Sequence, residues 1–250
     1  MDHNYAPQPS TLRFYPEAAV GGYPHNDGEV EFYLRIGSLV GPDSRVLDLG
    51  AGRGQWAVEP APRVRRDVRW FKGRVAEVVG SDVDPAVLDN PALDRAVVTG
   101  LGEPLPFDDH YFDVVIADWV LEHVAPEDVE TFVAEVVRVV KPGGWFVART
   151  PFKWGLTGLG ARAVPNKWHT RVLSRLQPTR PAVDVFPTRY AMNTRRALRR
   201  HFAGHEVFIY GHEAVPTYFE RYRPTWFLAA LFNRLAPRRF AATLNVFVRV

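Results

Sequence analysis

The stretch "VLDLGAGRG", residues Val46–Gly54, places three alternating glycines directly after a short apolar run. Glycine lets the backbone turn sharply and approach a ligand closely, because it has no side chain to obstruct the approach. An apolar strand followed by such a turn is typical of the first βα unit of doubly wound α/β proteins. The stretch therefore predicts an α/β fold with a ligand site where this strand ends.

Two kinds of phosphate site fit the glycine pattern poorly. A triphosphate-binding loop requires a lysine after its last glycine, whereas Gly54 is followed by Gln55 and Trp56. A dinucleotide site has the spacing G-x-G-x-x-G and an acidic residue ~20 positions later. This sequence has G-x-G-x-G, and Asp82 follows Gly54 by 28 residues. The first interpretation is excluded and the second is weakened.

Asp48 indicates a different ligand. It lies two positions before the first glycine, at the end of the predicted strand. A carboxylate at this place repels a pyrophosphate and favours a cationic group. S-adenosylmethionine presents an ammonium, a carboxylate and a ribose, and its carboxylate suits the free backbone amides at the helix start after Gly54.

Strand and helix signals alternate on both sides of this loop, which predicts parallel βαβ units. A helix is expected over 28–41, before the first strand. The strongest helical pattern covers 126–144, with Pro126 in its first turn and Gly143 and Gly144 as its stop. Strands are expected at 45–49, 77–82, 95–99, 112–118, 144–150, 205–211 and 243–250.

Four motifs in order carry a resemblance to a known family: "VLDLGAGRG", "VVGSDVDP", "GLGEPLPFDDHYFDVVIADWVLEHV" and "VVKPGGWFVARTP". Together they resemble the class I S-adenosylmethionine-dependent methyltransferases of the methyltransferase type 11-like group. The resemblance implies an α/β fold, a Rossmann-like doubly wound seven-stranded mostly parallel sheet with a helical cap insertion. It also implies S-adenosyl-L-methionine as the cofactor and a cytoplasmic enzyme.

The resemblance divides the chain into four parts. Residues 1–44 are expected to form an N-terminal arm and helix that contribute to a lid over the acceptor and cofactor. Residues 45–151 form the cofactor-binding core, and 152–203 form a basic helical cap. Residues 204–250 supply the strands and helix that complete the sheet.

The resemblance also assigns the cofactor site residue by residue. Asp82 is expected to bind both ribose hydroxyls and Val83 to lie against the adenine, while Asp84 caps the following helix. Where relatives often carry an acidic and then a small residue, this chain has Leu101 and Gly102, so adenine recognition passes to the backbone or to Glu103. The implied cofactor-binding residues are Asp48, Gly50, Ala51, Gly52, Gly54, Asp82, Val83, Gly102, Glu103, Asp118, Trp119 and His123.

Methyl transfer needs alignment of donor and acceptor, and a hydroxyl or amine acceptor also profits from a general base. The candidates for that base are His123 and His169. No metal is expected, because the eight histidines are scattered and none forms an H-x-x-x-H pair within one helix. The acceptor is expected to contact Tyr23, His25, Trp154, Trp168, Arg189 and Tyr190.

Charge is distributed unevenly along the chain. Residues 1–150 hold 14 Lys and Arg against 24 Asp and Glu, whereas 151–250 hold 17 against 4. The basic part favours an anionic acceptor: a small molecule, a sugar or a lipid-linked compound. Nucleic acid is a less favoured partner, because no RNA-binding module is visible. Three alternatives stay open: an RNA methyltransferase, a non-catalytic S-adenosylmethionine-binding protein at a membrane surface, and peripheral membrane contact by 224–240.

Several observations bound the setting of the protein. The chain has no cysteine, so it has neither disulfides nor thiolate metal sites. The N-terminal sequence lacks the order of a signal peptide, and no apolar run reaches the ~20 residues of a membrane span. The segment 224–240 is apolar with basic flanks, and packing between the last two strands is its favoured role. The oligomeric state is left open.

Overall fold

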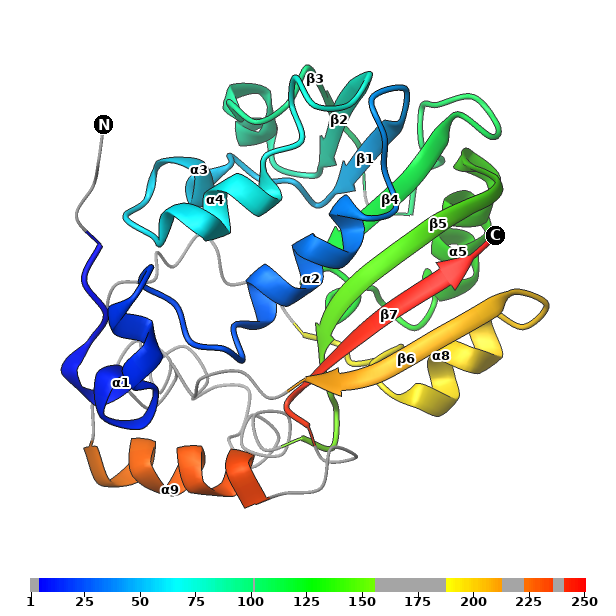
Figure 1. The fold of residues 1–250 in the computed structure, drawn as a ribbon. Coiled ribbons are helices and arrows are strands. Elements are labelled where there is room, and N and C mark those ends of the chain that lie inside the picture. The colour runs from blue at the N-terminus through cyan, green and yellow to red at the C-terminus, as the bar shows by residue number, and fades with distance from the viewer. Residues whose placement is uncertain (1–4, 101, 156–187, 213–222, 236–240) are drawn as a thin grey trace.

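A computed structural model describes residues 5–100, 102–155, 188–212, 223–235 and 241–250. Seven strands form one sheet in the order β3-β2-β1-β4-β5-β7-β6. Neighbouring strands from β3 to β5 are parallel, and β7 runs antiparallel to both β5 and β6 (Figure 1). This order confirms the predicted doubly wound, mostly parallel sheet.

The strand bounds follow the predicted ones closely, except in β5. The inner strands are short apolar runs buried on both faces, whereas the two edge strands, β3 and β6, are more exposed. The strands are β1 (Arg45–Leu49), β2 (Glu77–Asp82), β3 (Arg95–Val98), β4 (Phe112–Asp118), β5 (Val140–Pro151), β6 (Glu206–His212) and β7 (Thr243–Arg249).

Helices cover both faces of the sheet. Helices α2 and α4 lie on one face of the sheet and α5 and α8 on the other, with α8 beside β6 (Figure 1). The first helix after β1 is a single turn. The helices are α1 (Pro9–Phe14), α2 (Gly28–Gly37), α3 (Gln55–Val58), α4 (Arg63–Arg69), α5 (Val129–Val139), α8 (Arg195–His201) and α9 (Arg223–Leu235), with 3-10 turns η1 (Pro16–Ala19) and η2 (Pro85–Asp89).

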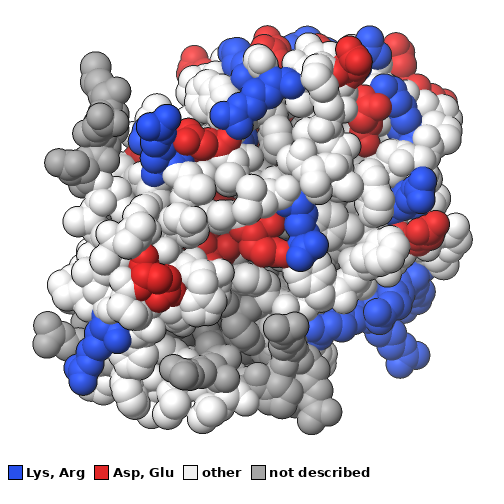
Figure 2. Space-filling model, viewed as in Figure 1, with Lys and Arg blue, Asp and Glu red and all other residues white. Residues whose placement is uncertain are grey.

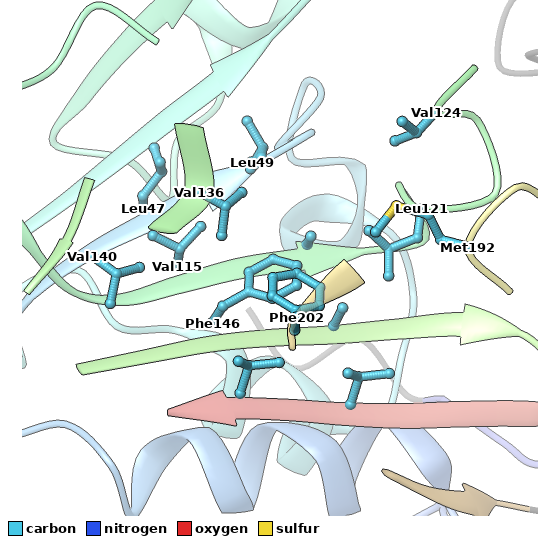
Figure 3. Close-up of a cluster of buried hydrophobic side chains, with 14 of the residues drawn as sticks. Leu47, Leu49, Val115, Leu121, Val124, Val136, Val140, Phe146, Met192 and Phe202 are labelled. Atoms are coloured by element: carbon cyan, nitrogen blue, oxygen red, sulfur yellow. The ribbon is translucent and has the colours of Figure 1, made fainter. Parts of the chain in front are cut away.

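Two hydrophobic clusters, one on each face, hold the helices to the sheet. In the larger cluster, Phe146 of β5 stacks on Phe202 at 5.2 Å between ring centroids, and Val136 of α5 packs nearby (Figure 3). In the other cluster, Phe32 and Tyr33 of α2 are almost fully buried. Since a buried side chain of this size contributes about 1.5–3 kcal/mol, these contacts fix the strand ends that carry the site.

Helix α2 is also tied to the far edge of the sheet by polar contacts. The Glu31 carboxylate accepts hydrogen bonds from the hydroxyl of Tyr210, at 3.0 and 3.1 Å, and from the Asn245 amide, at 3.0 Å. Burial, together with the Glu31 charge, raises the pKa of Tyr210 to about 12. The phenol therefore stays a donor, and α2 is held in register over β7 and β6.

The structure differs from the predicted helix over 126–144. Helix α5 begins at Val129 after Asp128 and ends at Val139, and β5 begins at the next residue. Gly144 lies where a side chain would meet the Asp113 carbonyl oxygen at 2.8 Å, and Gly143 has a φ of 80°. Gly144 therefore allows a close approach to β4 and Gly143 a left-handed backbone turn, and neither is a helix stop.

The predicted helical cap falls mainly on 156–187, which lie outside the described residues. Its last part is described, and there α8 packs Leu198 and Phe202 into the larger hydrophobic cluster. The cap and the lid role of the N-terminal arm stay predictions.

Candidate functional site

The glycine loop after β1 has the backbone geometry that the sequence predicts. Gly50, Gly52 and Gly54 have φ values of 78°, 52° and 68°, in the left-handed region that other residues rarely adopt. A side chain on Gly50 would approach the Val120 methyl to 2.5 Å, and one on Gly54 would overlap the Asn90 side chain. Both the dihedral angles and the packing therefore require glycine here.

Asn90 fixes the glycine loop through side-chain hydrogen bonds, a role that the sequence analysis missed. Its side-chain amide donates to the carbonyl oxygens of Ala51 and Gly52, each at 3.1 Å, and its own oxygen accepts from the Ala92 amide at 3.0 Å. Asn90 is buried. A buried amide with its donors and acceptor used fixes the loop in one conformation. Its place at the end of η2, far from the loop in sequence, gave no signal.

Asp82 ends β2 and faces the glycine loop, as the resemblance implies. One carboxylate oxygen accepts from the Gly52 amide at 2.8 Å and the other from the Asp84 amide at 2.9 Å. Each oxygen keeps a lone pair for a further donor, and the side chain is only half-buried. Asp84 itself accepts from the Ala86 amide at 2.9 Å, which confirms it as the cap of η2.

Asp48 lies beneath the loop, on the α2 and α4 side of the sheet. It lines a small cavity of about 10 Å³ together with Tyr33, Trp56 and Arg69, room for about one water molecule. Burial raises the pKa of Asp48 to about 6; Arg69 opposes the rise, whereas the charges of Asp118 and Asp82 add to it. The three carboxylates thus repel one another across the strand ends.

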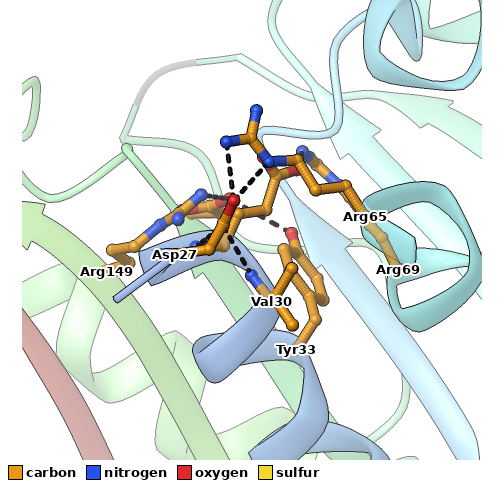
Figure 4. Close-up of polar contacts among 8 residues, drawn as sticks. Asp27, Val30, Tyr33, Arg65, Arg69 and Arg149 are labelled. Carbon is orange, nitrogen blue, oxygen red and sulfur yellow. Dashed lines mark hydrogen bonds and ion pairs between the residues drawn. The ribbon is translucent and has the colours of Figure 1, made fainter. Parts of the chain in front are cut away.

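Asp118 at the end of β4 has a partner that the sequence analysis missed (Figure 4). Arg149 of β5 donates to both Asp118 oxygens, from Nε at 2.7 Å and from Nη2 at 2.8 Å, and the Tyr33 hydroxyl donates at 3.1 Å. Burial raises the pKa of Asp118, but the charge and hydrogen bonds of Arg149 outweigh it and the pKa lies below its usual value.

This pairing limits what Asp118 can offer a ligand. Its side chain is almost fully buried and both oxygens are used within the protein. Of the contacts that the family resemblance implies for Asp118, the one through its backbone carbonyl remains, and it stays a prediction. The ring of Trp119, the next residue, already has the Arg149 guanidinium 5.5 Å from its centroid.

Arg69 of α4 brings a second buried cation to the site. Its guanidinium lies 4.5 Å from the Trp56 ring centroid and 4.9 Å from that of Tyr33, and donates to Glu29 at 3.1 Å. Its Nε is buried without a hydrogen-bond partner. Next to it, Arg65 binds the Asp27 carboxylate that caps α2 (Figure 4). These contacts lock α4 to the start of α2.

The predicted adenine contacts lie on the outer side of the site. Val83 follows Asp82 and is 37% exposed, so its side chain is accessible to a flat apolar ligand. Glu103 is exposed, and its carboxylate accepts from the Gly100 amide at 3.1 Å. Gly102 has a φ of 73°. Contact of these residues with the adenine stays a prediction.

The loop after β4 contacts residues 189 and 190, which lie further along the chain than β5. The amides of Arg189 and Tyr190 donate to the Glu122 carbonyl oxygen at 2.6 and 3.2 Å. The Lys153 ammonium donates to the Tyr190 carbonyl at 3.5 Å. Trp119 and Trp154 remain 38% and 49% exposed. Two predicted acceptor residues, Arg189 and Tyr190, are therefore brought next to the β4 loop.

Beneath this meeting point lies Glu122, a buried carboxyl group that the sequence analysis did not single out. It accepts from the Thr150 hydroxyl at 3.0 Å, and the Asn193 amide donates to the same hydroxyl oxygen. Burial raises the pKa of Glu122 to about 7, although the hydrogen bonds oppose the rise. Its "LEHV" context, directly after a predicted strand, was the available signal.

The other predicted residues are placed as follows. His123 is half-buried, and its amide donates to the Val120 carbonyl at 2.9 Å. His25 is exposed and binds Glu17 through Nδ1 at 2.7 Å, and Tyr23 lies half-buried in the same N-terminal arm. Trp168 and His169 lie outside the described residues. The described contacts of His25 are with Glu17 and with the Tyr15 ring, both in the N-terminal arm.

The chemistry of the cluster favours a ligand with positive charge. Asp48, Asp82 and Asp118 converge at the ends of three adjacent parallel strands. Of the three, Asp118 has both carboxylate oxygens bound by one guanidinium, that of Arg149. A cationic group near Asp48 would relieve the repulsion that raises its pKa. Among the described residues, no group of three His, Asp or Glu side chains is arranged to hold a metal ion.

Comparison with known proteins agrees with this geometry. Residues 47–148 match the family described as a methyltransferase domain. The chain is 33% identical over 124 residues to an uncharacterised methyltransferase of Synechocystis, covering 48% of this chain and 53% of that protein. It is 35% identical over 112 residues to a ubiquinone/menaquinone biosynthesis C-methyltransferase of Burkholderia mallei, covering 42% of each. The chain thus spans about half the length of these relatives, or less.

Solved structures share the fold at low sequence identity. A methyltransferase from Archaeoglobus fulgidus superposes with a TM-score of 0.55 at 18% identity, covering 95% of this chain and 99% of that one. A geranyl diphosphate C-methyltransferase from Streptomyces coelicolor gives a TM-score of 0.53 at 18% identity, covering 89% and 80%. These likenesses support the fold and no more.

Proposed function

We propose that the protein is a class I S-adenosylmethionine-dependent methyltransferase, on the premise that residues 47–148 match the methyltransferase domain family. It transfers a methyl group from S-adenosyl-L-methionine to an anionic small-molecule or lipid-linked acceptor. The observation that carries the proposal is the set of three carboxylates around a glycine loop, with the Asp48 pKa raised to about 6. A ligand with both a ribose and an ammonium suits these groups.

Two carboxylates and the backbone after the glycine loop hold the cofactor in this proposal. Asp82 accepts the ribose hydroxyls with the lone pairs left after its bonds to the Gly52 and Asp84 amides. Asp48 faces the ammonium, and the backbone after Gly54 faces the carboxylate. Bound S-adenosylmethionine supplies an electrophilic methyl group on a sulfonium. The protein contributes position, charge and exclusion of water.

The acceptor region is proposed at the meeting of the β4 loop with residues 189–193. Trp119 and Trp154 offer exposed aromatic surface, and Arg189 and Lys153 offer positive charge beside them. Aromatic faces with cations suit an apolar acceptor that bears a negative charge. One relative is named for ubiquinone and menaquinone biosynthesis, and a solved structure of the same fold is a geranyl diphosphate C-methyltransferase in complex with geranyl diphosphate, an apolar chain that bears a negatively charged group.

His123 and His169 remain the proposed general bases for a hydroxyl or amine acceptor. Glu122 is an additional candidate, since a carboxyl group with a pKa near 7 exchanges a proton near neutral pH. It differs from the histidines in being buried, and its partners Thr150 and Asn193 are buried as well, so it reaches the acceptor only through movement of the loop.

Transfer of a labelled methyl group to extract of the source organism tests the proposal. The extract is separated into water-soluble, lipid and RNA fractions before incubation with the protein and labelled cofactor. We expect label in the soluble or lipid fraction, and none with an Asp82→Ala variant. Label in RNA alone would contradict the acceptor class, and label in no fraction would contradict the activity.

A further inference from the structure

Helix α9 carries apolar side chains on both of its faces, although it lies at the surface of the molecule. Its inner face buries Trp226, Ala229 and Ala230. The Trp226 ring packs edge-on against Phe14 of α1 at 4.7 Å between centroids. Apolar side chains on two faces of one helix are normally covered by protein or lipid.

The outer face of α9 forms a continuous stripe of exposed residues. Its members recur at the spacing of one helical face and are 39% to 72% exposed. The helix has 13 residues, so the stripe extends over about 20 Å at the rise of an α-helix. The outer stripe consists of Phe227, Leu228, Leu231, Phe232 and Leu235.

The position of α9 leaves the outer stripe accessible. The helix lies along one end of the molecule, beyond α1 and away from the sheet (Figure 1). In the same view this end carries few charged side chains among the described residues (Figure 2). Contiguous exposed apolar surface of this kind marks an interaction site rather than ordinary surface.

The basic residues in α9 and α1 indicate which partner the outer stripe binds. Helix α9 contains Arg223 and Arg234 and no acidic residue, and Arg13 of the adjoining α1 is exposed. The chain from 151 to 250 carries a net charge of +13, against −10 for residues 1–150. An anionic surface therefore attracts residues 151–250 taken together and repels residues 1–150.

We propose that the outer stripe of α9 docks on an anionic lipid bilayer, with the helix lying in the interface. A second copy of this chain is the poorer occupant, because it carries the same net charge of +13 over residues 151–250 and is repelled by it. No helix in the described parts of the chain is long and apolar enough to cross a membrane, so the contact is peripheral. The inference is independent of the methyl transfer proposed above.

Vesicle flotation of the full chain tests this surface. One set of vesicles contains phosphatidylcholine only, and the other contains equal parts phosphatidylcholine and phosphatidylglycerol. We expect the protein to float with the mixed vesicles at low salt, to float less at high salt because screening weakens the attraction, and to stay at the bottom with phosphatidylcholine alone.

Variants of α9 separate the outer stripe from general charge. Leu228→Glu with Phe232→Glu is expected to weaken vesicle binding at least about tenfold, since two apolar side chains that the bilayer would bury are lost. Leu34→Glu on α2 is the matched control, because Leu34 is 57% exposed and Leu228 63%. This control is expected to bind as the unchanged protein does.

A second variant guards against misfolding. Leu228→Ala with Phe232→Ala and Leu235→Ala introduces no charge and is expected to weaken binding in the same direction while the melting temperature is kept. Failure of the unchanged protein to float with mixed vesicles would overturn the proposal. So would equal flotation of all variants, or a dimer in sedimentation analysis that the same substitutions dissolve.

Discussion

Arg149 of β5 binds Asp118 of β4 through two parallel hydrogen bonds, at 2.7 and 2.8 Å, where both residues are almost fully buried. The two strands are paired at this position, with Asp118 opposite Arg149 in the register. A buried pair of this kind is costly to break, since one charge then remains in a low-dielectric setting. It therefore fixes the ends of β4 and β5 from which the proposed acceptor region begins.

Removing one member of this pair should destabilise the protein strongly. We expect Arg149→Met to lower the free energy of unfolding by about 3–5 kcal/mol, because the Asp118 carboxylate loses its partner. Urea unfolding measures this. The double variant Asp118→Leu with Arg149→Met should recover much of the loss. A double variant as unstable as Arg149→Met alone would show that the pair does not act as a unit.

The raised pKa of Asp48 predicts that cofactor binding weakens in acid. Only the carboxylate form attracts an ammonium, so affinity for S-adenosylhomocysteine should fall by up to about tenfold from pH 7 to pH 5, across the pKa of about 6. Calorimetric titration at several pH values measures the change. Asp48→Asn should bind weakly at both pH values, and a variant that keeps the pH dependence would assign it to another group.

The same pKa predicts a stability effect of opposite sign. Because the folded-state pKa of Asp48 lies above the ordinary 3.8, the folded protein loses stability as pH rises from about 4 through 6. Asp48→Asn should therefore be more stable than the unchanged protein at pH 8, by at most about 3 kcal/mol. Thermal unfolding at pH 8 and pH 4 measures this, and a variant less stable at pH 8 would contradict the cause assigned to the shift.

Gly50 is expected to be essential for the loop. Gly50→Ala forces a side chain toward Val120, at 2.5 Å, and strains a φ of 78°, so cofactor binding should fall by more than about tenfold. Gly143→Ala is the control, since Gly143 has a φ of 80° but no neighbour within 4 Å of the added carbon. It should lose some stability and bind the cofactor normally. Equal cofactor affinity of Gly50→Ala and Gly143→Ala would contradict the claim that the contact with Val120 requires glycine at position 50.

Glu122 should make the protein less stable in alkali. Its folded-state pKa of about 7 lies above the ordinary 4.5, so stability falls as pH rises from about 4.5 through 7. Glu122→Gln keeps an acceptor for the Thr150 hydroxyl and has no charge to bury. We expect this variant to gain stability relative to the unchanged protein between pH 5 and pH 8 in thermal unfolding. If Glu122→Gln and the unchanged protein differed in melting temperature by the same amount at pH 5 and at pH 8, the raised pKa of Glu122 would be contradicted.

The parts of the fold that the sequence predicted are those set by local patterns. β1, β2 and β4 were predicted within a residue because each is a short β-branched run bounded by turn residues. Helix α5 was predicted too long, because the valines at its end suit a helix and a strand equally. Pairing of β5 with β4 decides that Val140 starts a strand.

The site divides in the same way. The glycine loop, Asp82 and the cap at Asp84 follow from motifs that are contiguous in sequence. Asn90, Arg149 and Tyr33 act on the loop and on Asp118 from other elements. Their roles depend on strand order and helix packing, which no local pattern contains. For this reason the paired state of Asp118 was missed.

Cofactor binding through Asp82 is the central claim, and isothermal titration with S-adenosylhomocysteine tests it most directly. Asp84→Ala is the matched control: it removes a neighbouring carboxylate that caps η2, so it should cost about 1 kcal/mol of stability and bind nearly as well as the unchanged protein. Asp82→Ala should bind more than about tenfold more weakly, because two charge-assisted hydrogen bonds to the ribose are lost. Equal affinity of Asp82→Ala and Asp84→Ala, or no measurable binding by the unchanged protein, would contradict the account.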